Sequence, residues 1–318
     1  MERNNLGGIV VSSEPVLQLH NVTKKIGRRV IVDQLTFDVP KGEVFGFLGP
    51  NGAGKTTTIR MIVGLIKMTK GEVIVNGISI KNNFQLAMTH IGAIVENPEM
   101  YKFLSGYQNL LLFARRHQQV TKARIDEVIQ LVGLQHRIHD KVKKYSLGMR
   151  QRLGVAQALL HKPSVLIFDE PTNGLDPAGI RELRDYLRKL AKEEGIAVIV
   201  SSHLLSEMEL MCDRIAIIQN GKLIDIRKIH ELRQQVGVQQ VTIEVSDAIA
   251  AQQHVQAFYP DLAVVIQGNS IQLVIDRSTI PEVVRYLVHQ QIDLFSIQLG
   301  QQSLEDQFLQ LTGGEQIV

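Results

Sequence analysis

The chain has 318 residues, enough for one large and one smaller domain, and its 44% hydrophobic content with a mean hydropathy of +0.02 is ordinary for a globular protein. No run of 18 apolar residues exists to span a bilayer, and the opening MERNNLGGIVVSSEP lacks a signal-peptide pattern, so we expect residues 1–15 to be a flexible leader. The net charge of +3 is too small to indicate a nucleic-acid partner, and the single Cys212 excludes an intrachain disulfide and suits a reducing cytoplasm.

Strand and helix patterns alternate up to about residue 235, which predicts an α/β domain over residues 16–235 with a largely parallel sheet. A small antiparallel layer is expected to precede residue 43, and helical spacing from about Ser105 to His161 predicts a helical subdomain over about residues 98–161. Turns are expected at Asn76-Gly77 and Asn220-Gly221. The expected strands of this domain are Val16–Asn21, Val30–Val39, Glu43–Leu48, Gly71–Val75, Val165–Phe168, Ala197–Val200 and Ile215–Ile218.

A polar, glutamine-rich stretch at residues 234–240 marks a predicted boundary before a C-terminal accessory domain over residues 240–318. Its pattern predicts the order β-α-β-β-α-β, a ferredoxin-like α+β arrangement, with an added helix at Leu304–Leu311. It contains no cluster of residues suited to catalysis or metal binding, so we interpret it as accessory. The expected strands and helices are Val241–Val245, Ala248–Phe258, Leu262–Ile266, Ile271–Ile275, Ile280–His289 and Leu294–Leu299.

The segment GPNGAGKT at residues 49–56 has the spacing of a phosphate-binding P-loop. Its glycines let the backbone N–H groups surround a polyphosphate, and the helix expected at Thr57–Ile66 adds positive potential at its start. Lys55 is expected to reach the β and γ phosphates, while the Thr56 hydroxyl holds Mg²⁺. The predicted nucleotide-binding residues here are Gly49, Pro50, Asn51, Gly52, Ala53, Gly54, Lys55, Thr56 and Thr57.

Two carboxylates end the apolar segment VLIFDE at residues 165–170. In a P-loop ATPase, Asp169 would hold Mg²⁺ and Glu170 would polarise the attacking water, although a strand end of this kind is also common at protein surfaces. His203 follows the strand that ends in Ser201 and Ser202. A histidine in such a loop is more often structural, but ligands of α/β sheets bind at this edge, which favours a catalytic role.

The segment YSLGMRQR at residues 145–152 predicts the start of a helix. Ser146 is suited to cap that helix, and Gly148 allows the backbone to approach an anion at its positive end. Basic residues gather from His136 to Arg152, and they fit either a solvated surface or a surface that faces phosphate or anionic lipid.

With these motifs in this order, residues 16–230 resemble the ATP-binding cassette (ABC) ATPases. The resemblance makes Tyr145–Met149 the signature segment, Asp176 part of the D-loop, and His203 the sensor of the γ-phosphate. It further implies two cassettes paired head to tail around two ATP molecules, so that each P-loop faces the Ser146 and Gly148 of the other subunit. Asp176 is a further predicted nucleotide-binding residue.

Three positions depart from the common ABC pattern. The signature has Leu147 and Met149 where Gly and Gln are usual, and Ile26 stands where an aromatic normally stacks on adenine. Glu96 replaces a metal-contacting Gln, and its carboxylate can still ligate Mg²⁺.

These departures, with the ending SLEDQFLQLTGG, resemble the bacitracin and lantibiotic exporter ATPases. The resemblance implies an ATPase subunit at the inner face of the cell membrane that powers efflux of an antimicrobial peptide or drug through a separate integral-membrane permease, with a second ATPase subunit as partner. A soluble cassette that acts on ribosomes or DNA is the alternative. It is disfavoured because the chain has one P-loop and too few residues between Lys55 and Ser146 for a long coiled coil. A module that binds ATP without hydrolysing it is disfavoured by Glu170 and His203.

Overall fold

The computed structural model describes residues 15–96, 98–117, 119–234, 238–260 and 262–300, and the chain divides into two compact units between Arg227 and Lys228. The expected leader up to residue 14 and the expected helix at Leu304–Leu311 lie outside the described residues. Among the described residues, no helix combines the length and the apolar character that crossing a membrane requires.

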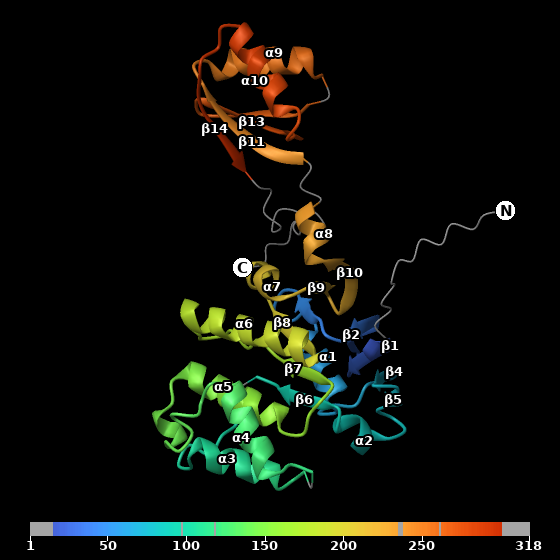
Figure 1. Cartoon of the computed structure of the whole chain (residues 1–318). Helices are drawn as coiled ribbons and strands as arrows, with labels where there is room; N and C mark the ends of the chain where they lie inside the picture. The colour runs from blue at the N-terminus through green and yellow to red at the C-terminus, as the bar shows by residue number, and fades with distance from the viewer. Residues whose placement is uncertain (1–14, 97, 118, 235–237, 261, 301–318) are drawn as a thin grey trace, which may run out of the picture. The chain divides into compact units, whose positions relative to one another are not determined.

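The first unit contains two sheets (Figure 1). The first sheet is antiparallel, with the order β2-β1-β4-β5: Arg29–Pro40, Pro15–Ile26, Lys70–Val75 and Ile78–Ser79. The second has the order β10-β9-β3-β8-β7-β6, in which β9, β3, β8, β7 and β6 run parallel: Lys222–Lys228, Arg214–Gln219, Val44–Leu48, Ala197–Ser202, Val165–Phe168 and Ile91–Ile94.

The core of the first unit lies between these sheets and buries side chains from both. The ring of Phe37 on β2 stacks on Phe45 and meets Phe47 edge-on, at centroid distances of 5.6 and 5.3 Å. Every residue of β3 is buried, as expected for a central parallel strand that is covered on both faces. This packing holds the end of β3, from which the P-loop starts, in a fixed position.

Helices flank the second sheet and also form a separate helical region within the first unit (Figure 1). The helical region contains α3, α4, a 3₁₀ turn and α5: Gly106–Ala114, Lys122–Leu131, Val142–Lys144 and Leu147–Leu159. The remaining described helices of this unit are α1, α2, α6 and α7: Lys55–Ile62, Phe84–Met88, Pro177–Glu194 and Leu205–Met211.

The helix after the P-loop differs from the prediction, because α1 spans Lys55–Ile62 rather than residues 57–66. It ends early because Gly64 adopts a left-handed conformation with φ of 74° and its N–H bonds to the Met61 carbonyl. The two predicted Asn-Gly turns are present: in both Asn76-Gly77 and Asn220-Gly221 the two residues have positive φ, as a tight hairpin requires.

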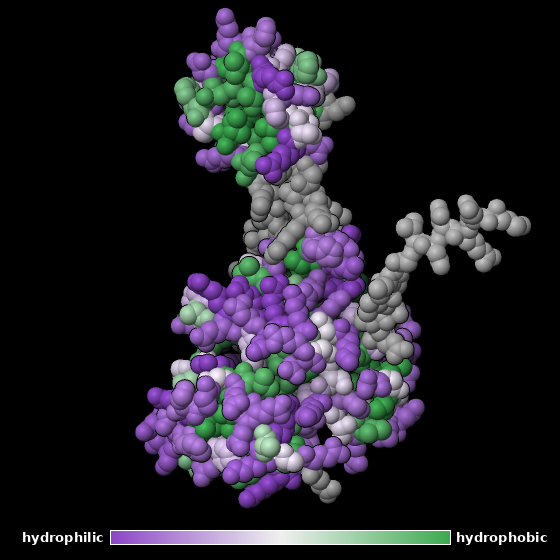
Figure 2. Space-filling view, viewed as in Figure 1, coloured by the Kyte–Doolittle hydropathy of each residue, from purple (hydrophilic) through white to green (hydrophobic). Residues whose placement is uncertain are grey.

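The second unit begins with α8, Ile229–Gln234, after which the observed order is β-α-β-β-α-β, as the sequence predicts for residues 240–299. Its strands form one antiparallel sheet with the order β12-β13-β11-β14, and α9 and α10 bury apolar side chains against it. Exposed apolar side chains of this unit include Phe295, Ile297 and Leu299 of β14, and Figure 2 shows an apolar area on its surface. The bounds of β11, α9, β12, β13, α10 and β14 are Val238–Val245, Ala248–Phe258, Val264–Gln267, Ser270–Asp276, Ile280–His289 and Leu294–Gly300.

Candidate active site

The P-loop joins β3 to α1, and among the described residues no side chain caps the start of α1, where backbone N–H groups can bind an anion. Gly54 has a φ of 106°, and a Cβ atom on it would lie 3.1 Å from the Ile31 carbonyl oxygen. A Cβ atom on Gly49 would lie only 2.1 Å from the carbonyl oxygen of Ile218. Only glycine therefore fits at these two positions.

Lys55 is 5% exposed, and its ammonium group lies at the centre of the site. Its Nζ donates to the carbonyl oxygens of Gly49 and Pro50, at 2.6 and 3.3 Å, and lies 3.4 Å from Glu170 Oε1. Burial lowers the pKa of Lys55, an effect that the carboxylates of Glu170 and Asp169 oppose. The ammonium is thus already desolvated and held by groups that a polyphosphate can replace.

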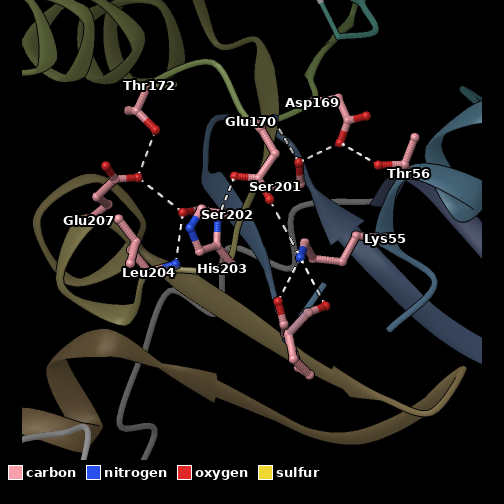
Figure 3. Close-up of polar contacts among 12 residues, drawn as sticks. Lys55, Thr56, Asp169, Glu170, Thr172, Ser201, Ser202, His203, Leu204 and Glu207 are labelled. Atoms are coloured by element: carbon pink, nitrogen blue, oxygen red, sulfur yellow. Dashed lines mark hydrogen bonds and ion pairs between the residues drawn. The ribbon is translucent and has the colours of Figure 1, made fainter. Parts of the chain in front are cut away.

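Asp169 and Thr56 form the oxygen-rich part of the site (Figure 3). Asp169 is 2% exposed, and its Oδ1 accepts hydrogen bonds from Thr56 Oγ1 at 3.2 Å and from Ser201 Oγ at 2.6 Å. The same Ser201 hydroxyl accepts the backbone N–H of Glu170 at 2.8 Å. A carboxylate and a hydroxyl at this separation fit the hard oxygen ligands that Mg²⁺ takes, so these residues suit the predicted metal.

Glu170 and His203 meet beside Lys55 (Figure 3). Glu170 Oε2 lies 3.0 Å from His203 Nδ1, and the two side chains are 18% and 25% exposed. The backbone of Glu170 has a φ of 49°, a conformation that is uncommon outside glycine and recurs at functional sites. The carboxylate therefore bridges a cation and an imidazole, with partial access to solvent.

A cavity of about 430 Å³ opens over these groups. It brings together most of the P-loop with both predicted catalytic residues, and it adds Arg29, Ile31 and Asn173, which the sequence analysis did not identify as site residues. Its lining residues are Arg29, Ile31, Asn51, Gly52, Ala53, Gly54, Lys55, Thr56, Thr57, Glu170, Asn173 and His203.

Five predicted nucleotide-binding residues do not line this cavity: Gly49 and Pro50, whose carbonyl oxygens bind Lys55 instead, and Ser146, Gly148 and Asp176. Ser146 caps α5 by accepting the Met149 N–H at 3.2 Å, and Asp176 caps α6 by accepting the Gly179 N–H at 2.8 Å. A Cβ atom on Gly148 would meet only Leu175 Cδ2, at 3.9 Å. Packing within the described chain therefore gives no reason for glycine at this position.

Glu96, the third predicted metal ligand, does not line this cavity either. It follows β6 with a φ of 67°, and its carboxylate forms an ion pair with Arg60 on α1. Both side chains of this pair are exposed, at 40% for Arg60 and 62% for Glu96. The metal-ligand role of Glu96 therefore stays a prediction.

A family model described as ABC transporter matches residues 32–173. The ABC transporter ATP-binding protein YhcH of Bacillus subtilis (strain 168) is 57% identical over 306 residues, covering 94% of this chain and 96% of that protein. The chain belongs to the ABC transporter ATP-binding proteins. The α/β cassette fold and the ATPase activity expected from the sequence are those of this family.

Two further proteins similar to this ABC ATPase are informative. The bacitracin transport ATP-binding protein BcrA of Bacillus licheniformis is 40% identical over 303 residues, covering 94% of this chain and 98% of that protein. The dimeric post-hydrolysis structure of the ATP-binding cassette MJ0796, bound to ADP and Pi, has a TM-score of 0.59 at 25% identity and covers 67% of this chain and 98% of that chain. The resemblance to bacitracin transport ATPases predicted from the sequence is confirmed.

The Ser201 hydroxyl provides a test of this geometry, because it orients the Asp169 carboxylate and the Glu170 backbone together. Ser201→Ala is expected to lower ATP turnover about 10- to 100-fold, as the loss of a group that orients a metal ligand does. Ser202→Ala is the matched control, since the Ser202 hydroxyl bonds instead to Glu207. Equal turnover of the two variants in a phosphate-release assay would contradict the role of Ser201.

Proposed function

We propose that this ABC ATPase hydrolyses ATP with Glu170 as the general base and thereby powers an exporter. The observation that carries the proposal is the meeting of Lys55, Glu170 and His203 in the cavity lined by the P-loop. The groups needed to bind a triphosphate, activate a water and contact the γ-phosphate thus share one space.

Each side chain has a role that follows from its position. Lys55 would exchange its carbonyl partners for the β and γ phosphate oxygens, which frees Glu170 from part of its ion pair. The released carboxylate would orient a water and accept its proton, while His203 contacts the γ-phosphate. Thr56 and Asp169 would hold Mg²⁺, with Glu96 proposed as a third ligand. Mg²⁺ supplies neutralisation of phosphate charge.

The nucleotide site is proposed to be completed by a second copy of this chain in a head-to-tail homodimer. Ser146 and Gly148 lie outside the cavity of their own chain, and no contact within the described residues requires glycine at 148. Both observations are consistent with a signature segment that contacts the phosphates bound by the P-loop of a partner chain. Asp176, exposed at the start of α6, would lie in the same interface.

The transported substrate is proposed to be an antimicrobial peptide or a drug, and the bacitracin transport relative supports this class. We propose that the ATPase acts in the cytoplasm at the inner face of the membrane, bound to a separate integral-membrane permease. Growth inhibition by bacitracin-type peptides, before and after deletion of the gene, tests this assignment directly.

The general-base role is tested by Glu170→Gln, which keeps a similar shape but removes the basic oxygen. ATP turnover should fall at least about 100-fold, the contribution expected of a general base, while ATP binding and ATP-dependent dimerisation persist. Glu207→Gln is the control, because this nearby carboxylate bonds to Thr172 and Ser202 rather than to the cavity. Near-normal turnover of Glu170→Gln would remove Glu170 from this role.

The shared site is tested by mixing two inactive variants, Lys55→Ala and Gly148→Glu. Each homodimer then has two defective sites, whereas a mixed head-to-tail dimer has one intact site. Random association of equal amounts should restore roughly a quarter of wild-type turnover. Because the space at Gly148 is open, Gly148→Glu is expected to fold, which circular dichroism checks. A mixture as inactive as its components would argue against a shared site.

The role of Glu96 is tested by pairing Glu96→Gln with Arg60→Gln. Loss of the carboxylate should weaken activation by Mg²⁺ and Mn²⁺, whereas loss of Arg60 should strengthen it by freeing that carboxylate. The ion pair is exposed and contributes about 1 kcal/mol or less, so the Arg60 effect should be fivefold or smaller. Titrations of turnover against metal that are unchanged in Glu96→Gln would rule out ligation by Glu96.

A further inference from the structure

The first strands of the chain place an arginine over the nucleotide cavity. Arg29 and Ile31 on β2 both line it, as expected for residues two apart on one face of a strand. Ile26 on β1 is directly opposite Arg29 in the hairpin register, so the Ile26 side chain lies on this same face. Ile26 is 59% exposed, which leaves its aliphatic surface available.

Most of the other residues that line the cavity are suited to bind the triphosphate. Residues 51–57 supply the P-loop backbone and the side chains of Lys55 and Thr56, while Glu170 and His203 suit the γ-phosphate end. The β2 residues belong to neither group, and a Cβ on Gly54 would lie 3.1 Å from the Ile31 carbonyl, which shows that β2 lies directly against the loop. The base and ribose are the parts of the nucleotide left to face β2.

Arg29 has the chemistry to hold a base. Its guanidinium is planar and stacks on aromatic faces, and the side chain is exposed and forms no ion pair with another described residue. Ile26 and Ile31 add apolar surface on the same face of the hairpin. An aromatic side chain is thus not needed for a stacking contact.

We propose that Arg29 stacks on the purine base of the bound nucleotide, with Ile26 and Ile31 as its apolar flank. The inference rests on the proposed nucleotide site and names the residues that hold its base. Because stacking engages the face of a base and not its hydrogen-bonding edge, adenine and guanine nucleotides bind with similar affinity. The site is then a purine-nucleotide site with little discrimination between the two bases.

The experiment measures equilibrium binding of ADP, GDP and ribose 5-diphosphate to the full chain, so that no hydrolysis is involved. Arg29→Ala is expected to weaken ADP and GDP binding roughly 5- to 150-fold, the range for one stacking contact, and to leave ribose 5-diphosphate binding unchanged. Arg29→Lys should lose a similar factor, because it keeps the charge and loses the plane. Arg28→Ala, with the same charge loss in the turn, is the control and should bind ADP within about twofold of wild type.

A rescue variant makes the test independent of folding. Ile26→Tyr in the Arg29→Ala chain places an aromatic ring on the same face and should restore ADP binding. Equal weakening of ADP and ribose 5-diphosphate by Arg29→Ala would show that Arg29 contacts phosphate, and unchanged ADP binding would show no contact; either result overturns the proposal. The proposed role of Glu170 has a separate test. If Glu170→Gln still hydrolyses ATP, that role is wrong, but the effects of the Arg29 variants on ADP, GDP and ribose 5-diphosphate binding are unaffected.

Discussion

The ion pair between Lys55 and Glu170 is the interaction on which the site depends. Both groups are largely buried, and either one left alone would be an uncompensated charge in a poorly solvated position. The Lys55 ammonium and the Glu170 carboxylate therefore stabilise each other, and in the proposed mechanism a polyphosphate would provide Lys55 with new partners. In the proposed mechanism, nucleotide binding and the release of the Glu170 carboxylate are two parts of one exchange, so Glu170 is freed to act as the base only when a nucleotide is bound.

The order of the strands makes this exchange possible. Lys55, Glu170 and His203 follow the carboxyl ends of β3, β7 and β8, which are neighbours in the sheet although far apart in the chain. Parallel strands bring their carboxyl ends to one edge, and β8 lies between β3 and β7. Ser201, near the end of this middle strand, can therefore reach Asp169 and the Glu170 backbone at once.

The site residues that the sequence predicted belong to short motifs of consecutive residues. A few neighbouring residues are enough to identify the glycine spacing around Lys55, and the same holds for the two carboxylates that follow an apolar strand. Ser201 and Arg29 do not, because contacts between distant segments place them: the pairing of β8 with β7 for Ser201, and the approach of β2 to the P-loop for Arg29. The ion pair of Glu96 with Arg60 is also a tertiary contact, which no local pattern near Glu96 reveals.

The strand positions and turns of the fold could be predicted from the alternation of apolar residues and from Asn-Gly pairs, whereas the end of α1 depended on the backbone conformation of Gly64.

The helix α6 connects two distant parts of the first unit. It starts at the Asp176 cap and runs 18 residues, about 27 Å, to a region where the Ala191 carbonyl lies beside Gly42, just before β3. The helix thus links the loop that is proposed to face a second chain with the strand that carries the P-loop. Over this length a tilt of a few degrees displaces the far end by about 2 Å, so a neighbouring molecule that docked at the Asp176 end, as proposed, would also shift the residues just before the P-loop strand.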